Sequence, residues 1–141
     1  EIKMYKTPFK GPRRLRIDNE GGIWIAAFPE SQIVRFDQEK ESFEFHDLPV
    51  KPLGSETPYS LNIDKKRSII WVNGNTSDAL YAYYYKKDQW QHYPMAKKVT
   101  FTRDVEIAPD GTVFTTNSSF PSWHIEDAQP TLIVLKPALT Q

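Results

Sequence analysis

Residues 11–49 read GPRRLRIDNEGGIWIAAFPESQIVRFDQEKESFEFHDLP and contain four short apolar runs with turn residues between them. No run continues with the 3.6-residue period of an amphipathic helix, and each has the length of a short strand. Glycine, asparagine, aspartate and charged residues separate the runs, as they do at the tips of hairpins. The stretch therefore predicts four consecutive antiparallel strands.

The same order of runs and turns occurs twice more. Residues 57–95 read TPYSLNIDKKRSIIWVNGNTSDALYAYYYKKDQWQHYPM, and residues 100–137 read TFTRDVEIAPDGTVFTTNSSFPSWHIEDAQPTLIVLKP. Ile17, Ile63 and Ile107 correspond in the three copies, with offsets of 46 and 44 residues. Three copies of one unit therefore fill almost the whole chain.

A period of about 45 residues with four short strands per unit is typical of a β-propeller blade. Such a sheet is apolar on both faces, so successive blades bury one another. Trp24, Trp71 and Phe114 occupy matching positions and are expected between blades. The 11 prolines and the aromatic content of 13% also favour strands over a helix bundle. We predict an all-β fold, a β-propeller of about three four-stranded blades.

The predicted ring is partial, and residues 1–141 are expected to form a single partial propeller domain. Its expected parts are an outer strand of a preceding blade (1–10), two complete blades (11–50 and 56–96) and a last blade without its outer strand (100–137). Known propellers have about four to eight blades. The ring is therefore expected to close either with the remainder of a longer chain or with a second copy in a homodimer.

Composition limits the classes of partner. The 18 basic and 18 acidic residues give a net charge of 0, which provides no field to attract nucleic acid or an anionic membrane. No apolar run approaches the length of a membrane-spanning helix, which is about 18 residues or more. Because the chain has no cysteine, it has no disulfide and no cysteine nucleophile, but the compartment stays open. We prefer a periplasmic or secreted location as a hypothesis.

The segments GPRRLRIDNEGGIWIA, FPESQIVRFDQEKESFEFHDLP and TRDVEIAPDGTVFTTN resemble repeats of the virginiamycin B lyase (streptogramin lyase) family. NHL-repeat and gluconolactonase-like propellers share much of the pattern and are the second choice. The resemblance implies a ring of six or seven blades. It also implies a small cyclic or lactone-type ligand over the central tunnel, which the lyases open by Mg²⁺-assisted elimination.

The sequence departs from the lyase pattern where those enzymes place catalytic histidine and glutamate. The equivalent positions here are Ala26-Ala27, Asn73-Gly74 and Thr116-Asn117. A general base needs a titratable group within reach of the proton it takes. We therefore identify no catalytic residue and no metal ligand in this chain. A carbon–oxygen lyase, a ligand-sensing propeller and a protein-interaction propeller stay open as functions.

Candidate ligand-binding residues lie where the first strand of each unit begins and the second ends, because these ends lie near the tunnel of a propeller. Arginines from two blades are suited to bind a carboxylate or phosphate through paired donors. The predicted ligand-binding residues are Arg14, Tyr59, Asn73, Arg103, Asp104, Asn117, Trp123 and His124. The structural alternatives are an ion pair between Arg103 and Asp104, a solvated Arg13, and asparagines that bond turn backbone.

Three histidines and a tyrosine run complete the candidates. His124 lies beside Trp123 and two carboxylates in the longest interruption of the repeat, where it is placed to bind a metal or act as a base. A loop that packs over a blade edge is the alternative. His46 and His92 fall on predicted outer strands and are expected at the surface. The tyrosines of YAYYYKKDQW, residues 81–90, are expected in the core between blades.

Overall fold

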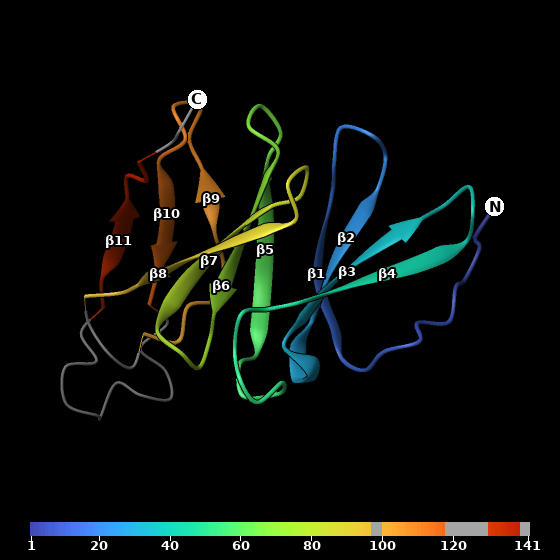
Figure 1. The fold of residues 1–141 in the computed structure, drawn as a ribbon, viewed down its shortest axis with the longest axis horizontal. Coiled ribbons are helices and arrows are strands. Elements are labelled where there is room, and N and C mark those ends of the chain that lie inside the picture. The colour runs from blue at the N-terminus through green and yellow to red at the C-terminus, as the bar shows by residue number, and fades with distance from the viewer. Residues whose placement is uncertain (97–99, 118–129, 139–141) are drawn as a thin grey trace.

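The computed structural model describes residues 1–96, 100–117 and 130–138, and it is an all-β structure with one short 3₁₀ turn (Figure 1). The elements are β1 (Pro12–Ile17), β2 (Ile23–Ala27), η1 (Phe28–Glu30), β3 (Gln32–Asp37), β4 (Ser42–Asp47), β5 (Pro58–Asp64), β6 (Ile69–Gly74), β7 (Ala79–Tyr84), β8 (Gln89–Pro94), β9 (Glu106–Ile107), β10 (Val113–Thr116) and β11 (Leu132–Leu135). No helix in these ranges is long and apolar enough to cross a bilayer.

The strands form three antiparallel sheets that follow one another along the chain (Figure 1). Their orders are β1-β2-β3-β4, β5-β6-β7-β8 and β9-β10-β11, so each strand pairs with its neighbour in sequence. We call these sheets blades 1, 2 and 3. The predicted propeller fold of successive blades is confirmed. The strands end where turn residues were expected; Gly111, at the tip between β9 and β10, has a φ of +91°, which an L side chain rarely adopts.

Aromatic side chains fill the spaces between the blades, as predicted. Trp24 of β2 is 2% exposed and packs against Tyr83 of blade 2, and Trp71 of β6 is buried with Val105 and Val113 of blade 3. Because side chains alternate across a strand, the neighbours of each tryptophan face the opposite blade. Phe114, the third member of this series, is only half-buried on the outward face of blade 3.

The two outward faces of the three-blade unit expose large apolar side chains. On blade 1 these are Leu15, Ile17 and Phe45, with exposures of 49%, 47% and 43%. On blade 3 they are Leu132 and Val134, with exposures of 63% and 48%. In blade 2 the residues that match Leu15 and Ile17 are Leu61 and Ile63, which are buried against blade 1. The exposed faces therefore have the pattern of faces that pack against another blade.

The outer strand expected within residues 1–10 belongs to a preceding blade that the described residues do not include, so it stays a prediction. This segment contains no strand and lies on the outward face of blade 1, where Tyr5 contacts Phe36 with ring centroids 4.8 Å apart. Phe9 is buried in a cluster with Phe36 and other residues of blade 1. A strand needs a neighbouring edge for its backbone hydrogen bonds, and a segment on the face of a sheet meets side chains instead.

His46 differs from its prediction. It is half-buried between blades 1 and 2, where the Tyr83 hydroxyl lies 2.8 Å from its Nδ1, and it is not a surface side chain. Outer strands of adjacent blades lie side by side, so one face of each is covered by the next blade. His92 is exposed on β8 and stacks on Tyr81, with ring centroids 5.1 Å apart. Tyr81 and Tyr83 are buried, as predicted.

Candidate functional site

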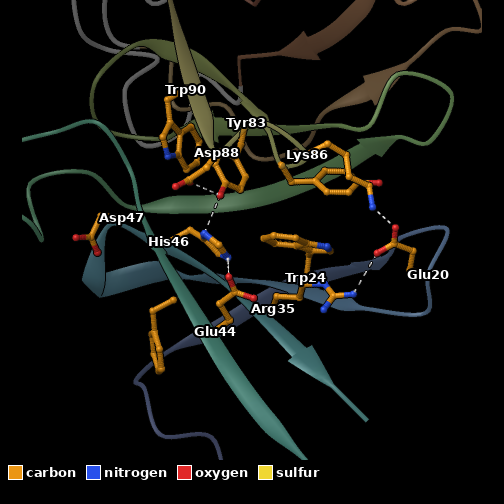
Figure 2. Close-up of a pocket in the computed structure, with 12 residues that line it drawn as sticks. Glu20, Trp24, Arg35, Glu44, His46, Asp47, Tyr83, Lys86, Asp88 and Trp90 are labelled. Atoms are coloured by element: carbon orange, nitrogen blue, oxygen red, sulfur yellow. Dashed lines mark hydrogen bonds and ion pairs between the residues drawn. The ribbon is translucent and has the colours of Figure 1, made fainter. Parts of the chain in front are cut away.

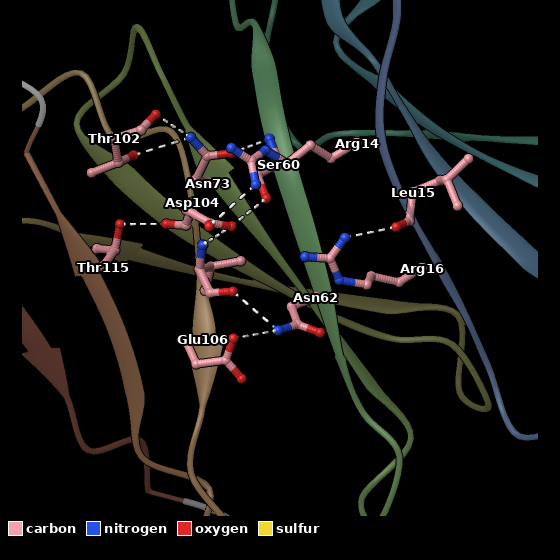
Figure 3. A network of polar contacts seen from close by, with 11 residues as sticks. Arg14, Leu15, Arg16, Ser60, Asn62, Asn73, Thr102, Asp104, Glu106 and Thr115 are labelled. Atoms are coloured by element: carbon pink, nitrogen blue, oxygen red, sulfur yellow. Dashed lines mark hydrogen bonds and ion pairs between the residues drawn. The ribbon is translucent and has the colours of Figure 1, made fainter.

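The first strands of the three blades, β1, β5 and the segment that leads into β9, lie next to one another and form the inner edge of the unit (Figure 3). Each carries one extra residue relative to its partner strand. Pro12 pairs with Ala27 and Leu15 with Ile25, so two residues of β1 oppose one of β2. The same shift lies between Pro58 and Leu61 in β5. Such β-bulges redirect side chains and are frequent beside active sites.

Blade 3 has an equivalent irregularity. Thr102 pairs with Asn117 and Glu106 with Phe114. Three residues of the segment before β9, 103–105, therefore oppose two residues of β10, 115–116. The extra residues in the three blades are therefore the pairs Arg13-Arg14, Tyr59-Ser60 and Arg103-Asp104. Their side chains form two layers at the inner edge, and each blade contributes one member to each layer.

The first layer contains Arg13, Tyr59 and Arg103, which we call the arginine–tyrosine cluster. The Tyr59 ring lies between the blades, with Cζ of Arg13 at 5.5 Å and Cζ of Arg103 at 5.7 Å from the ring centroid. The Arg13 guanidinium also lies 4.5 Å from the centroid of Phe28, which packs edge-on against Tyr59. Aromatic faces attract guanidinium groups, so the rings restrain the positions of both arginines.

The second layer contains Arg14, Ser60 and Asp104, and its members bond to one another (Figure 3). The Arg14 guanidinium donates to Oδ2 of Asp104 at 3.2 Å, and the Ser60 hydroxyl donates to Oδ1 at 3.1 Å. The Val105 amide donates to the same Oδ1 at 3.0 Å. Asp104 is therefore occupied on both oxygens, and it links the first strands of all three blades.

The charge of the inner edge is positive. Arg16, Asn62 and Glu106 form a third layer, in which the Asn62 amide reaches Oε2 of Glu106 at 3.5 Å. The three layers together hold four arginines and two carboxylates, which gives a net charge of +2. Arg13 and Arg103 have no carboxylate partner among the described residues. Among the residues that the structure describes, no carboxylate therefore competes with a ligand for their donors.

Asn73, a predicted ligand-binding residue, lies where blades 2 and 3 meet. It is fully buried; its Oδ1 accepts from the Ser60 amide at 2.6 Å, and its Nδ2 donates to the carbonyl and hydroxyl of Thr102. The side chain thus joins the bulge of blade 2 to the first strand of blade 3. A buried amide satisfied on both ends has no donor or acceptor for a ligand.

The other predicted residues divide into four groups. Tyr59 and Arg103 lie in the arginine–tyrosine cluster. Arg14 and Asp104 pair with each other, and the Arg103–Asp104 ion pair that was the structural alternative is not among the pairs of the described residues. Asn117 accepts a hydrogen bond from the Thr131 amide at 2.9 Å and pairs with Thr102 at the end of β10. Trp123 and His124 lie outside the described residues.

Arg13 is the member of the cluster that the sequence did not identify, since it was interpreted as solvated and Arg14 as the ligand-binding arginine. Strict alternation along β1 does not tell which of two adjacent arginines turns toward Tyr59. The β-bulge determines which arginine turns toward Tyr59. The sequence indicates this only through the repeat: Arg13, Tyr59 and Arg103 each precede the matching isoleucine of their blade, Ile17, Ile63 or Ile107, by four residues.

Magnesium, which the resemblance implies, does not fit the described residues. In these ranges no three histidine or acidic side chains come together at one point. Mg²⁺ prefers oxygen ligands in octahedral geometry, whereas Asp104 is occupied by Arg14, Ser60 and a backbone amide. The inner edge therefore provides cationic donors and aromatic rings.

Comparison with known proteins supports the fold. No protein-family model and no curated protein matches the chain. Among solved structures, it is similar to a catalytically inactive virginiamycin B lyase from Staphylococcus aureus determined with quinupristin, with a TM-score of 0.73 and 17% identity over 98% of this chain and 46% of the lyase. A streptogramin B lyase structure matches with a TM-score of 0.70 and 14% identity, over 96% of this chain and 43% of that protein.

A third match is the extracellular domain of a one-component system from Bacteroides thetaiotaomicron, with a TM-score of 0.70 and 16% identity, over 96% of this chain and 16% of that chain. The chain thus spans less than half the length of the lyases it resembles. These likenesses establish that its three blades have the fold seen in the virginiamycin B lyase structures.

Proposed function

We propose that this chain is the ligand-binding part of a β-propeller, and that the arginine–tyrosine cluster binds a small molecule through an anionic or carbonyl oxygen. The observation that carries the proposal is that Arg13 and Arg103, from blades 1 and 3, converge on Tyr59 of blade 2. Both guanidinium groups lack a carboxylate partner among the described residues. Two such forks are suited to a carboxylate, a phosphate or the carbonyl of a lactone.

The second layer supports this role by holding the site in place. Asp104, bonded to Arg14 and Ser60, ties the first strands of the blades together directly beneath the cluster. A ligand bound to both arginines therefore contacts all three blades at once, and preorganised donors lose less conformational entropy on binding. An exposed ion pair contributes only about 0–1 kcal/mol to stability, so the Arg14–Asp104 pair acts mainly through geometry.

Binding of a small cyclic or lactone-type compound is the specific form of the proposal. Its support is the fold likeness to a lyase determined with quinupristin and the position of the cluster at the inner edge, where the ends of propeller strands meet. Among the described residues of the three layers, Asp104 is held by Arg14 and Ser60, Glu106 accepts from Asn62, and the four arginines are donors, so the layers provide mainly binding groups. Ligand binding without catalysis is therefore the function these residues support best.

Calorimetric titration with phosphate, citrate and a δ-lactone tests the proposal. The wild-type chain should bind at least one of them. Arg13→Ala and Arg103→Ala should each weaken binding about ten- to 150-fold, because each removes one charged hydrogen-bond donor group worth about 1.5–3 kcal/mol. Arg16→Ala, a change on the same strand outside the cluster, is the matched control and should bind normally. Equal binding by the wild type and both cluster variants would contradict the proposal.

A carbon–oxygen lyase is the second candidate, favoured by the likeness to the lyases over 98% of this chain. Its test is turnover of a cyclic depsipeptide with and without Mg²⁺. Ring opening that depends on this chain would support it, and binding without product would favour a sensing propeller. The two outcomes separate a binding function from an enzymatic one.

We also propose that the outward faces of blades 1 and 3 pack against further blades, from a second copy or from the remainder of a longer chain. The support is the exposure of Leu15, Ile17, Leu132 and Val134 at positions whose equivalents in blade 2 are buried. Light scattering of the purified chain tests the homodimer. A mass of two chains that becomes one chain in Ile17→Asp supports it, and a monomer contradicts it.

A further inference from the structure

A second cleft lies at the other end of the interface between blades 1 and 2, away from the inner edge (Figure 2). Its volume is about 550 Å³, which is enough for a small organic molecule. The outer strand β4 of blade 1 forms one side, and the β7–β8 hairpin of blade 2 forms the other. None of the six predicted ligand-binding residues that the structure describes lines it.

Five of the twelve residues that line this cleft are aromatic, and we call them its aromatic wall: Trp24, Phe45, Tyr83, Tyr85 and Trp90. Trp24 is buried at its base, and its ring centroid lies 5.7 Å from that of Tyr85 and 5.1 Å from that of His46. Tyr83 stacks on Trp90, with centroids 4.6 Å apart. Tyr85 and Trp90 are half-buried, so parts of their rings are open to a ligand.

Carboxylates outnumber cations around these rings. The charged residues that line the cleft are Glu20, Arg35, Glu44, Asp47, Lys86 and Asp88, four acidic and two basic, which gives a net charge of −2. Both cations already have partners: the Arg35 Nε bonds to the buried Asp18 at 3.2 Å, and Lys86 pairs with Glu20. Glu44, Asp47 and Asp88 have no lysine or arginine partner among the described residues.

Asp88 and Asp47 keep their negative charge because the groups that bond to them are neutral. Asp88 accepts from the Tyr83 hydroxyl at 2.7 Å, and Asp47 accepts from the Gln32 side chain at 2.7 Å. Neither bond neutralises the charge. Burial lowers the pKa of His46, and this effect outweighs that of the neighbouring carboxylates, which raise it. The imidazole ring is therefore neutral at neutral pH and adds no positive charge to the cleft.

One end of the cleft already holds an ammonium group, that of Lys86, between an aromatic ring and a carboxylate. Nζ of Lys86 lies 5.4 Å from the centroid of the Tyr85 ring and pairs with Glu20 of the other blade (Figure 2). An aromatic face together with a carboxylate is the combination that attracts organic cations. The rest of the cleft offers Trp90 with Asp88 and Glu44, and Arg35, which pairs with Glu44 across β3 and β4, already bonds to Asp18.

We infer that this cleft binds a small organic cation, an alkylammonium or quaternary ammonium compound, between the Trp90 side of the aromatic wall and the carboxylates of Asp88 and Glu44. The site is separate from the arginine–tyrosine cluster, and the two sites select opposite charges. Because it lies between two blades, a bound cation contacts both and stabilises their packing.

Calorimetric titration with choline and with 3,3-dimethylbutan-1-ol, its neutral isostere, tests the inference on the intact chain. Choline should bind saturably and the neutral isostere should not. Trp90→Ala should weaken choline binding about two- to thirtyfold, since a cation–aromatic contact contributes about 0.5–2 kcal/mol. Asp88→Asn should weaken it too, although asparagine still accepts from Tyr83 and tolerates the positive φ of this position.

Glu41→Gln is the matched control. Glu41 occupies the corresponding place in the β3–β4 hairpin, with the same φ of +51° as Asp88, and does not line the cleft. Its binding should equal that of the wild type. Three results would overturn the inference: no saturable binding of choline, equal binding of the neutral isostere, or wild-type affinity in both Trp90→Ala and Asp88→Asn.

Discussion

Replacing Asn73 with alanine tests whether this residue is scaffold or ligand-binding. The side chain is fully buried and bonds the Ser60 amide at one end and Thr102 at the other. Alanine leaves the amide of buried Ser60 and the carbonyl of buried Thr102 without these partners. Each unsatisfied buried group costs about 1–3 kcal/mol, so Asn73→Ala should lower the free energy of unfolding by about 2–6 kcal/mol.

Urea denaturation measures this loss, which is large against a typical stability of about 5–15 kcal/mol. Asn19→Ala is the control, because Asn19 is exposed and makes one bond from its side chain to the Lys65 carbonyl; its cost should stay within about 1 kcal/mol. The reasoning fails if Asn73→Ala changes stability by no more than the control. Loss of ligand binding in a variant of unchanged stability would instead support the sequence interpretation.

Three further predictions concern the packing of blade 1. Trp24→Ala should cost about 3–5 kcal/mol in thermal or urea unfolding, because the ring is buried between blades and its Nε1 bonds to Asp18; a smaller loss than in Trp90→Ala would contradict this. Burial raises the pKa of Asp18, but hydrogen bonds from Trp24, two backbone amides and Arg35 outweigh burial and lower the pKa below 3.8. The ionised Asp18 therefore stabilises the fold above pH 3.8, and this stability should be lost as the pH falls through the pKa of the folded state. Asp18→Asn should flatten the acid limb of a pH–stability curve. Burial lowers the pKa of His46 below its ordinary 6.5, so protonation favours the unfolded chain; stability should decline as the pH falls below 6.5, and an equal decline in His46→Gln would exclude this cause.

The repeat in the sequence predicted the strands and turns because both depend on local chemistry. Alternating apolar residues and hairpin tips such as Asp110-Gly111 determine a blade almost independently of its neighbours. The position of Trp24 and Trp71 between blades followed from the same spacing. The burial of Tyr81 and Tyr83 followed from alternation along one strand.

The features that the sequence did not predict depend on contacts between blades. Arg13 rather than Arg14 lies over Tyr59 because a bulge in β1 shifts the side chains, and a bulge has no fixed sequence signature. Asn73 is buried because blade 3 supplies Thr102, which lies 29 residues further along the chain. His46 is covered by Tyr83 of the next blade.

The central claim is that Arg13, Tyr59 and Arg103 form an anion-binding site at the inner edge. A crystal of the chain soaked in selenate tests it most directly, because selenium is located by its anomalous scattering without reference to any interpretation of the site. We expect an anomalous peak between the two guanidinium groups, placed so that selenate oxygens accept hydrogen bonds from both, and we expect its loss in Arg103→Ala. A map with no selenium at this cluster, or with the same peak in the variant, would contradict the claim.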